Sequence, residues 1–111
     1  MTTQAQKFWL ETPLNAVKKL MDQTFSYAQD GDDLADMYME DFKDMKKAVT
    51  LFRNSDPEAL AKHVQYMDTS PRENLVEAFY FDCGNDFVEN ILGYEMSESW
   101  KDWQRENGVA V

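Results

Sequence analysis

The chain has 111 residues, of which 43% are hydrophobic and 14% aromatic, and this content predicts a single folded domain over residues 1–111. It carries 21 acidic and 11 basic residues, a net charge of −10, which excludes a typical nucleic-acid-binding protein and disfavours an anionic membrane surface as partner. One Cys cannot form an internal disulfide, and no apolar run is long enough to span a membrane, so we expect a cytoplasmic protein.

The first eleven residues form a polar lead-in segment, 1–11. It ends on the apolar run 8–10, which we expect to dock on the first helix or on a partner. Thr12 and Pro13 are typical of a helix start, with Thr12 as the N-cap. The apolar face of this first helix comprises Leu14, Val17, Met21, Phe25 and Ala28. Gly31 is expected to end it.

The stretch Asp30–Asn54 superposes two patterns. Apolar residues recur at spacings of three and four, which predicts a second helix with the stripe Leu34, Tyr38, Phe42, Met45, Val49 and Phe52. We expect Asp30 or Asp32 to cap this helix. Around the stripe lie seven acids with Lys43 as the only base among them, namely Asp30, Asp32, Asp33, Asp36, Glu40, Asp41 and Asp44. One face is therefore predicted to enter a core and the other to carry dense negative charge.

Start signals recur further along the chain. Ser55 or Asp56 is the expected N-cap of a third helix, which ends near Asp68. Ser70 and Glu73 stand three apart, as in a capping box, and predict the start of a fourth helix. The last helix is expected in the C-terminal segment 95–111, from a cap at Ser97 to about Asn107.

The fourth helix contains the pair Gly84-Asn85. The helical spacing of its apolar residues continues across this pair, which favours one kinked helix ending at Gly93. Two helices, with Asn85 capping the second, are the alternative. No run alternates with period two for long enough to predict a strand. The sequence therefore predicts an all-α fold, a single-domain antiparallel bundle of four to five helices.

A second acidic block runs from Asp68 to Glu98 with Arg72 as its only base. Its candidate partner-binding residues are Glu73, Glu77, Asp82, Asp86 and Glu89. If the two blocks adjoin, their carboxylates would stand ~5–6 Å apart along each helix and resemble the one-sided charge of nucleic-acid phosphates. We therefore expect a non-enzymatic module that binds another protein with a basic surface, in the manner of a virus-type inhibitor that mimics nucleic acid.

Large apolar residues support a second hypothesis. Trp9, Trp100 and Trp103 could anchor a partner, or they could close the ends of the bundle core. In the first case the protein would be a small accessory or oligomeric subunit, and the surplus of aromatic residues is also compatible with a homodimer.

The sequence contains no clear motif for catalysis or for binding a cofactor. The chain lacks HExxH and CxxC sequences, and the acidic loop around Gly31 lacks the spacing of a calcium-binding loop, so we expect no metal and no cofactor. Cys83 lies on an apolar stripe, which is typical of an inert buried thiol. The protein is therefore expected not to be an enzyme.

One histidine prompts a third hypothesis. The segment Asp56–His63 resembles the approach to the phosphorylated histidine of histidine phosphotransfer domains, which are small helical bundles. This resemblance implies a bundle in which His63 carries phosphate. The family's motif continues with a lysine and a glycine, whereas residues 64–67 are Val-Gln-Tyr-Met.

Overall fold

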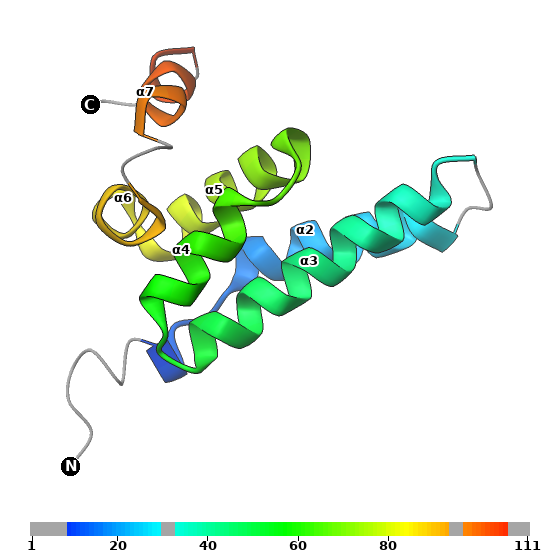
Figure 1. Ribbon diagram of the computed structural model, residues 1–111, viewed down its shortest axis with the longest axis horizontal. Coiled ribbons are helices and arrows are strands. Elements are labelled where there is room, and N and C mark those ends of the chain that lie inside the picture. The colour runs from blue at the N-terminus through cyan, green and yellow to red at the C-terminus, as the bar shows by residue number, and fades with distance from the viewer. Residues whose placement is uncertain (1–8, 30–32, 94–96, 107–111) are drawn as a thin grey trace.

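The computed structural model describes residues 9–29, 33–93 and 97–106, which contain helices and no strands (Figure 1). After a helical turn at residues 9–11, the elements are α2 (Asn15–Gln29), α3 (Ala35–Arg53), α4 (Pro57–Gln65), α5 (Thr69–Cys83), α6 (Asn85–Phe87), the π-helical segment η1 (Val88–Leu92) and α7 (Ser97–Glu106). The predicted all-α class is confirmed. Within the described ranges, no helix combines the length and the apolar character that crossing a bilayer requires.

Helices α2 and α3 run side by side as a hairpin (Figure 1). Three contacts between them set the register, namely Thr24 with Met45 (3.7 Å, Oγ1 to Sδ), Phe25 with Phe42 (5.0 Å between ring centroids) and Tyr27 with Tyr38 (5.2 Å). Residue numbers fall along α3 as they rise along α2, so this pair is antiparallel. The start of α2 therefore lies beside the end of α3.

The hydrophobic core lies where the other helices meet this hairpin. α4 packs beside α3 and η1, while α5 packs beside α2. Side chains that are 2% exposed or less come from each of these elements, namely Val17, Met45, Ala48, Phe52, Leu60, Val64, Leu75, Phe79, Val88 and Leu92. Val17, Met45 and Phe52 were on the apolar stripes predicted for the first two helices, and such stripes are why the fold class could be predicted.

The predicted continuous helix through Gly84 is wrong. α5 ends at Cys83, and Gly84 has φ +95° and ψ 169°. This conformation is not helical, and glycine adopts it more readily than other residues do. Phe79 and Phe87 are buried on either side of the break, so the apolar phase continues although the helix does not. This break is the main reason why the described residues form seven helical elements and not four to five.

Helix starts agree with the predictions in one case and differ in others. Asp56 is the N-cap of α4, as predicted, and its Oδ1 accepts a hydrogen bond from the N–H of Ala59 at 3.1 Å. α5 begins at Thr69 with Asp68 at its N-cap position, so the predicted capping box from Ser70 lies inside its first turn. α3 has Leu34 at its N-cap position. The predicted caps of α3, Asp30 and Asp32, lie outside the described residues.

The start of α2 shows the largest difference. The helix begins at Asn15, two residues after the predicted first position at Pro13. The N–H groups of Ala16 and Val17 donate to the two carboxylate oxygens of Asp82 on α5, at 2.8 and 2.9 Å. A negative charge at this position also interacts favourably with the positive end of the helix dipole. A residue distant in the sequence therefore performs the capping role assigned to Thr12.

Candidate functional site

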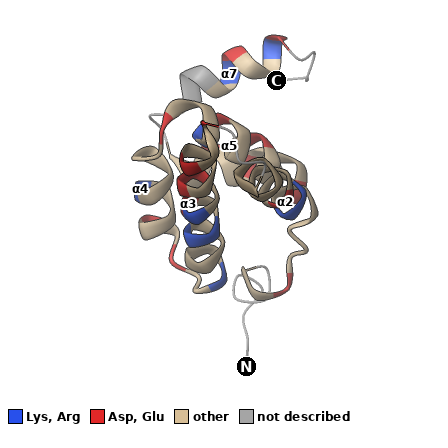
Figure 2. Ribbon diagram, turned by 90° about the vertical axis from the view of Figure 1, so that its right-hand side faces the viewer, with Lys and Arg blue, Asp and Glu red and all other residues tan. Residues whose placement is uncertain are grey.

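The acids of α3 form an exposed row on its N-terminal half. Asp33, Asp36 and Glu40 are exposed and Asp44 is half-buried. Asp36, Glu40 and Asp44 stand four residues apart, which corresponds to ~6 Å per step along one side of a helix. Figure 2 looks along α3 and shows its acidic and basic stretches as separate red and blue segments. Among the described residues the only ion pair, Asp102 with Arg105 at 3.0 Å, lies on α7, so this row is not neutralised by neighbouring lysines.

Asp41 differs from the other acids of this row because it is only 8% exposed. Burial raises the pKa of its carboxyl above the ordinary 3.8, and the neighbouring charges of Asp68, Asp44 and Glu40 raise it further. The folded state therefore holds the Asp41 proton more tightly than the unfolded state. Above the folded pKa the ionised carboxylate opposes folding, and this penalty disappears as the pH falls to 3.8 and below.

We expect Asp41→Asn to raise the free energy of unfolding at pH 7 by about 0.5 kcal/mol or more, because it removes like-charge repulsion and the burial of a charge. The gain should shrink at about pH 3, where the wild-type carboxyl is itself neutral. Urea unfolding followed by circular dichroism at both pH values measures the difference. The exposed Glu58→Gln is the matched control. A loss of stability in Asp41→Asn at pH 7 would contradict the pKa direction.

The acids of the second block are divided between the two ends of α5 and the elements after it. Glu73 and Asp86 are exposed, whereas Glu77 and Glu89 are half-buried. Asp82 is engaged at the start of α2, which lies beside the end of α3 and therefore at the opposite end of α3 from Asp36. The two blocks approach each other where Asp68, at the start of α5, is close enough for its charge to raise the pKa of Asp41. The structure brings these two together but does not align Asp82 with the α3 row.

The three tryptophans are placed mainly inside the chain. Trp9 is buried, with its ring centroid 4.8 Å from that of Phe52 and 5.7 Å from that of Phe87. Trp100 is also buried and stacks on the half-buried Trp103 with the centroids 4.8 Å apart. Two of the three predicted apolar anchors therefore belong to the core of this chain. The described end of the lead-in, residues 9–11, packs against the end of α3, where Arg53 donates hydrogen bonds to the carbonyl oxygens of Trp9 and Leu10. We had expected docking on the first helix or on a partner.

Asn85, which would cap a helix in the alternative prediction of two helices, holds α7. Its Oδ1 accepts hydrogen bonds from Trp100 Nε1 at 2.8 Å and from Gln104 Nε2 at 2.9 Å. The Oε1 of Gln104 is buried without a hydrogen-bond partner. These two contacts attach α7 to the start of α6.

Sequence reasoning missed a group of exposed apolar side chains near the end of the hairpin. Phe25 and Leu34 were predicted on inward stripes but are 42% and 47% exposed, and Met37 is 46% exposed. The periodicity of α3 correctly identified a stripe, but it contained no information on how far along the helix other elements would cover it. These residues are exposed because the hairpin extends beyond the helices that pack against it (Figure 1).

His63 and Cys83 occupy structural positions. The Nε2–H of His63 donates to the carbonyl oxygen of Asp44 at 2.8 Å, and since a carbonyl only accepts, this ring nitrogen carries the hydrogen. A phosphoryl group on Nε2 would have to displace this hydrogen bond. Burial raises the pKa of the Cys83 thiol to about 12, with Asp82 adding to the rise and Arg53 opposing it. The thiolate is therefore scarce at neutral pH.

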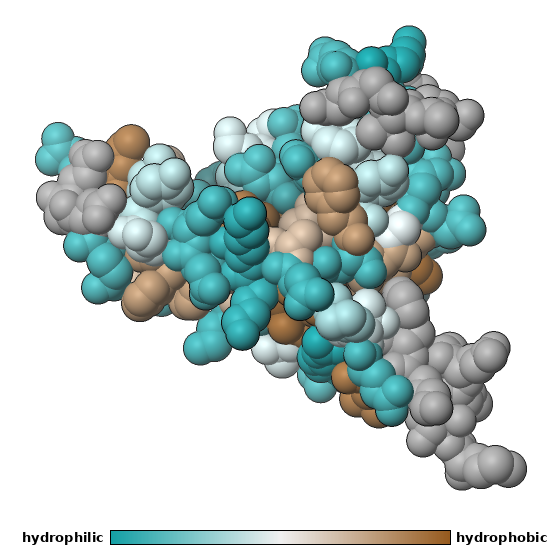
Figure 3. Space-filling model, turned by 180° about the vertical axis from the view of Figure 1, so that it is seen from behind, coloured by the Kyte–Doolittle hydropathy of each residue, from teal (hydrophilic) through white to brown (hydrophobic). Residues whose placement is uncertain are grey.

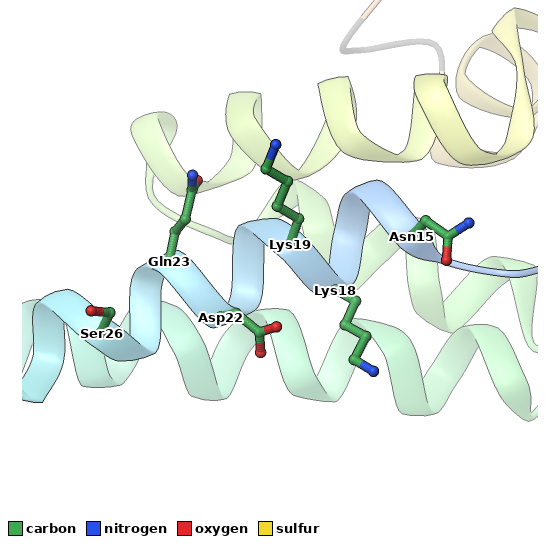
Figure 4. A pocket seen from close by; sticks show the side chains of 6 residues that line it. All are labelled: Asn15, Lys18, Lys19, Asp22, Gln23 and Ser26. Carbon is green, nitrogen blue, oxygen red and sulfur yellow. The ribbon is translucent and has the colours of Figure 1, made fainter.

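One shallow hollow lies along the outer surface of α2, lined by Asn15, Lys18, Lys19, Asp22, Gln23 and Ser26. All six side chains are exposed and come from one helix. Lys19 and Gln23 point to one side of α2, whereas Lys18 and Asp22 point to the other, so the polar groups do not converge (Figure 4). In the ranges 9–29, 33–93 and 97–106, no group of three or more His, Cys, Asp and Glu side chains is arranged to hold a metal ion.

Comparisons with protein-family models, with curated proteins and with solved structures found no match to this chain. Function must therefore be inferred from the surface.

Proposed function

We propose that the protein is a non-enzymatic binding module that recognises a basic surface of another protein through the acids of α3. The observation that supports this proposal is the row Asp36, Glu40 and Asp44, which has no ion-pair partner among the described residues. Such a row attracts a basic partner over a distance comparable with the Debye length, about 8 Å at physiological salt, and raises the association rate.

More specifically, the partner's basic surface is proposed to be one that otherwise binds nucleic acid. The row resembles a single phosphate strand, because Asp82 of the second block is engaged in the fold at the start of α2. Under this proposal the protein inhibits its target by occupying the strand-binding surface. Added duplex or single-stranded DNA should then displace the partner from the protein.

Reversal of charge tests the proposal. The triple variant Asp36→Lys, Glu40→Lys and Asp44→Lys should lose the partner captured from the native host, measured by affinity capture with quantitative mass spectrometry. The matched control reverses the exposed Asp22, Glu58 and Glu106, and both triple variants change the net charge from −10 to −4 because each reversal adds two charges. The control should retain the partner, since only the α3 row is proposed to contact it.

Capture should also weaken steeply between about 50 mM and 500 mM salt, because exposed charges are screened over this range. Circular dichroism verifies that each variant is folded. Equal recovery of the partner at both salt concentrations, or equal loss in the two triple variants, would contradict binding through the α3 row.

A further inference from the structure

The apolar stripe of α3 is longer than the part of the fold that covers it. Leu34 stands seven residues before the buried Asp41, which stands seven before the buried Ala48, so all three share one face of the helix. Met37 lies on the same face, four residues before Asp41. The stripe therefore continues toward the start of α3 with the spacing of a core-facing surface.

The covering elements stop near the middle of α3. His63, toward the end of α4, contacts the carbonyl of Asp44, and the charge of Asp68, just before α5, acts on Asp41. Beyond this level α2 and α3 extend alone (Figure 1). We call residues 25–29 and 33–40 the distal hairpin; none of these thirteen residues is buried. It contains four of the seven large hydrophobic side chains that are exposed among the described residues, namely Phe25, Tyr27, Leu34 and Met37.

The distal hairpin is also uniformly negative. It carries Asp33, Asp36 and Glu40 and no Lys or Arg. On the helix Asp33 and Glu40 lie beside the uncovered stripe, next to Met37, and Asp36 lies further round on the same side. Figure 3 shows hydrophobic surface at the left-hand end of the molecule, which is this end of the hairpin, next to strongly hydrophilic surface. An exposed apolar area with a charged rim is typical of a protein–protein interaction site.

We propose that the distal hairpin binds a cationic amphipathic helix of another protein, a proposal that rests on the function proposed above and names the chemistry of the partner. Two helices packed side by side present a surface on which a third helix can lie. The apolar face of the bound helix contacts Phe25, Leu34 and Met37. Its lysine or arginine residues face Asp33, Asp36 and Glu40. The six residues of α3 in the distal hairpin span ~9 Å, so about two turns of the bound helix are sufficient.

Charge favours this occupant over a second copy of the chain. Two distal hairpins packed face to face would bring together three acids from each copy, with no base in either segment to offset the repulsion. A cationic helix covers the same apolar residues and neutralises the acids. The apolar contacts provide affinity, and the acids select the sign of the partner's charge.

The test uses the full chain and a synthetic helical peptide of about 18 residues, with Leu on one face and Lys on the other. A scrambled peptide of the same composition, which has no apolar face, is the control ligand. Binding is measured by isothermal titration calorimetry against wild type, Leu34→Ser/Met37→Ser, and Asp36→Asn/Glu40→Gln. Tyr66→Ser is the matched control variant, because Tyr66 is 79% exposed but lies outside the distal hairpin.

We expect the amphipathic peptide to bind wild type and Tyr66→Ser equally, and to bind each double variant at least about tenfold more weakly. The scrambled peptide should bind wild type at least about tenfold more weakly than the amphipathic peptide does. Equal binding of both peptides would overturn the proposed docking of a helix while leaving the acidic binding function intact. Failure of both peptides to bind would count against the proposed function itself. A wild-type dimer that Leu34→Ser/Met37→Ser converts to monomer in sedimentation velocity would assign the surface to a second copy and overturn the proposal.

Discussion

Asp82→Ala should lower the free energy of unfolding by about 2–3 kcal/mol, because it removes two charge-assisted hydrogen bonds and a helix cap. In the wild type both carboxylate oxygens accept backbone N–H groups of α2, from Ala16 at 2.8 Å and Val17 at 2.9 Å. Without them these donors lose their partner, and α2 loses a tie to α5. Urea unfolding followed by circular dichroism measures the change.

Two further variants make this prediction specific. Asp82→Asn keeps one acceptor oxygen and should lose about half as much stability as Asp82→Ala. Asp86→Ala is the matched control, because Asp86 belongs to the same acidic block but is exposed, and its effect should stay within about 0.5 kcal/mol. An Asp82→Ala protein as stable as Asp86→Ala would show that the carboxylate contributes nothing to the fold.

The role of Asp82 could not be predicted from the spacing of charged residues in the sequence. Its spacing to Asp86 is typical of an exposed helix face, and nothing in the local sequence distinguishes the two residues. Only the packing of α5 against α2 directs Asp82 toward backbone N–H groups. Thr12 and Pro13 were the strongest local start signal in the chain, but a tertiary contact determines where the helix is capped. Long-range caps of this kind leave no periodic pattern to detect.

Periodicity predicted which helix faces enter the core more successfully than it predicted the ends of helices. The buried Met45 and Phe52 both lay on the predicted stripe of α3. The same stripe gave no indication that Leu34 would be exposed, because coverage depends on the lengths of α4 and α5. The break at Gly84 was given only as the alternative for a related reason, since the helical spacing of apolar residues resumes after one residue of non-helical backbone.

The same limit applies to the candidate site. The sequence identified the acids of α3 as a dense group, and the structure leaves Asp36 and Glu40 exposed. It could not show that Asp41 is buried among other acids, because that depends on the approach of Asp68 from α5. The tryptophans were equally compatible with a core and with an interface. Contacts with Phe52 and Phe87 place Trp9 in the core.

Phe52→Ala should have the largest effect on stability, a loss of about 3–5 kcal/mol, because it opens a cavity at the centre of the core. Phe52 is fully buried, and its ring centroid lies 4.8 Å from that of Trp9, 5.8 Å from that of Phe79 and 5.7 Å from that of Phe87. A domain of this size has about 5–15 kcal/mol of total stability, so the variant should be close to unfolding. Phe81→Ala is the control, since Phe81 is 62% exposed.

If the variant is too unstable to measure, Phe52→Leu keeps most of the volume and should lose about 1–1.5 kcal/mol. A double-mutant cycle of Phe52→Leu with Trp9→Leu then isolates the contact between the two rings, and we expect a coupling of about 0.5–1.5 kcal/mol. Such a coupling requires that the end of the lead-in is part of the folded core, which removes Trp9 from the residues available to a partner. Strictly additive losses in urea unfolding would contradict this packing, and Trp9 would return to consideration as a surface anchor.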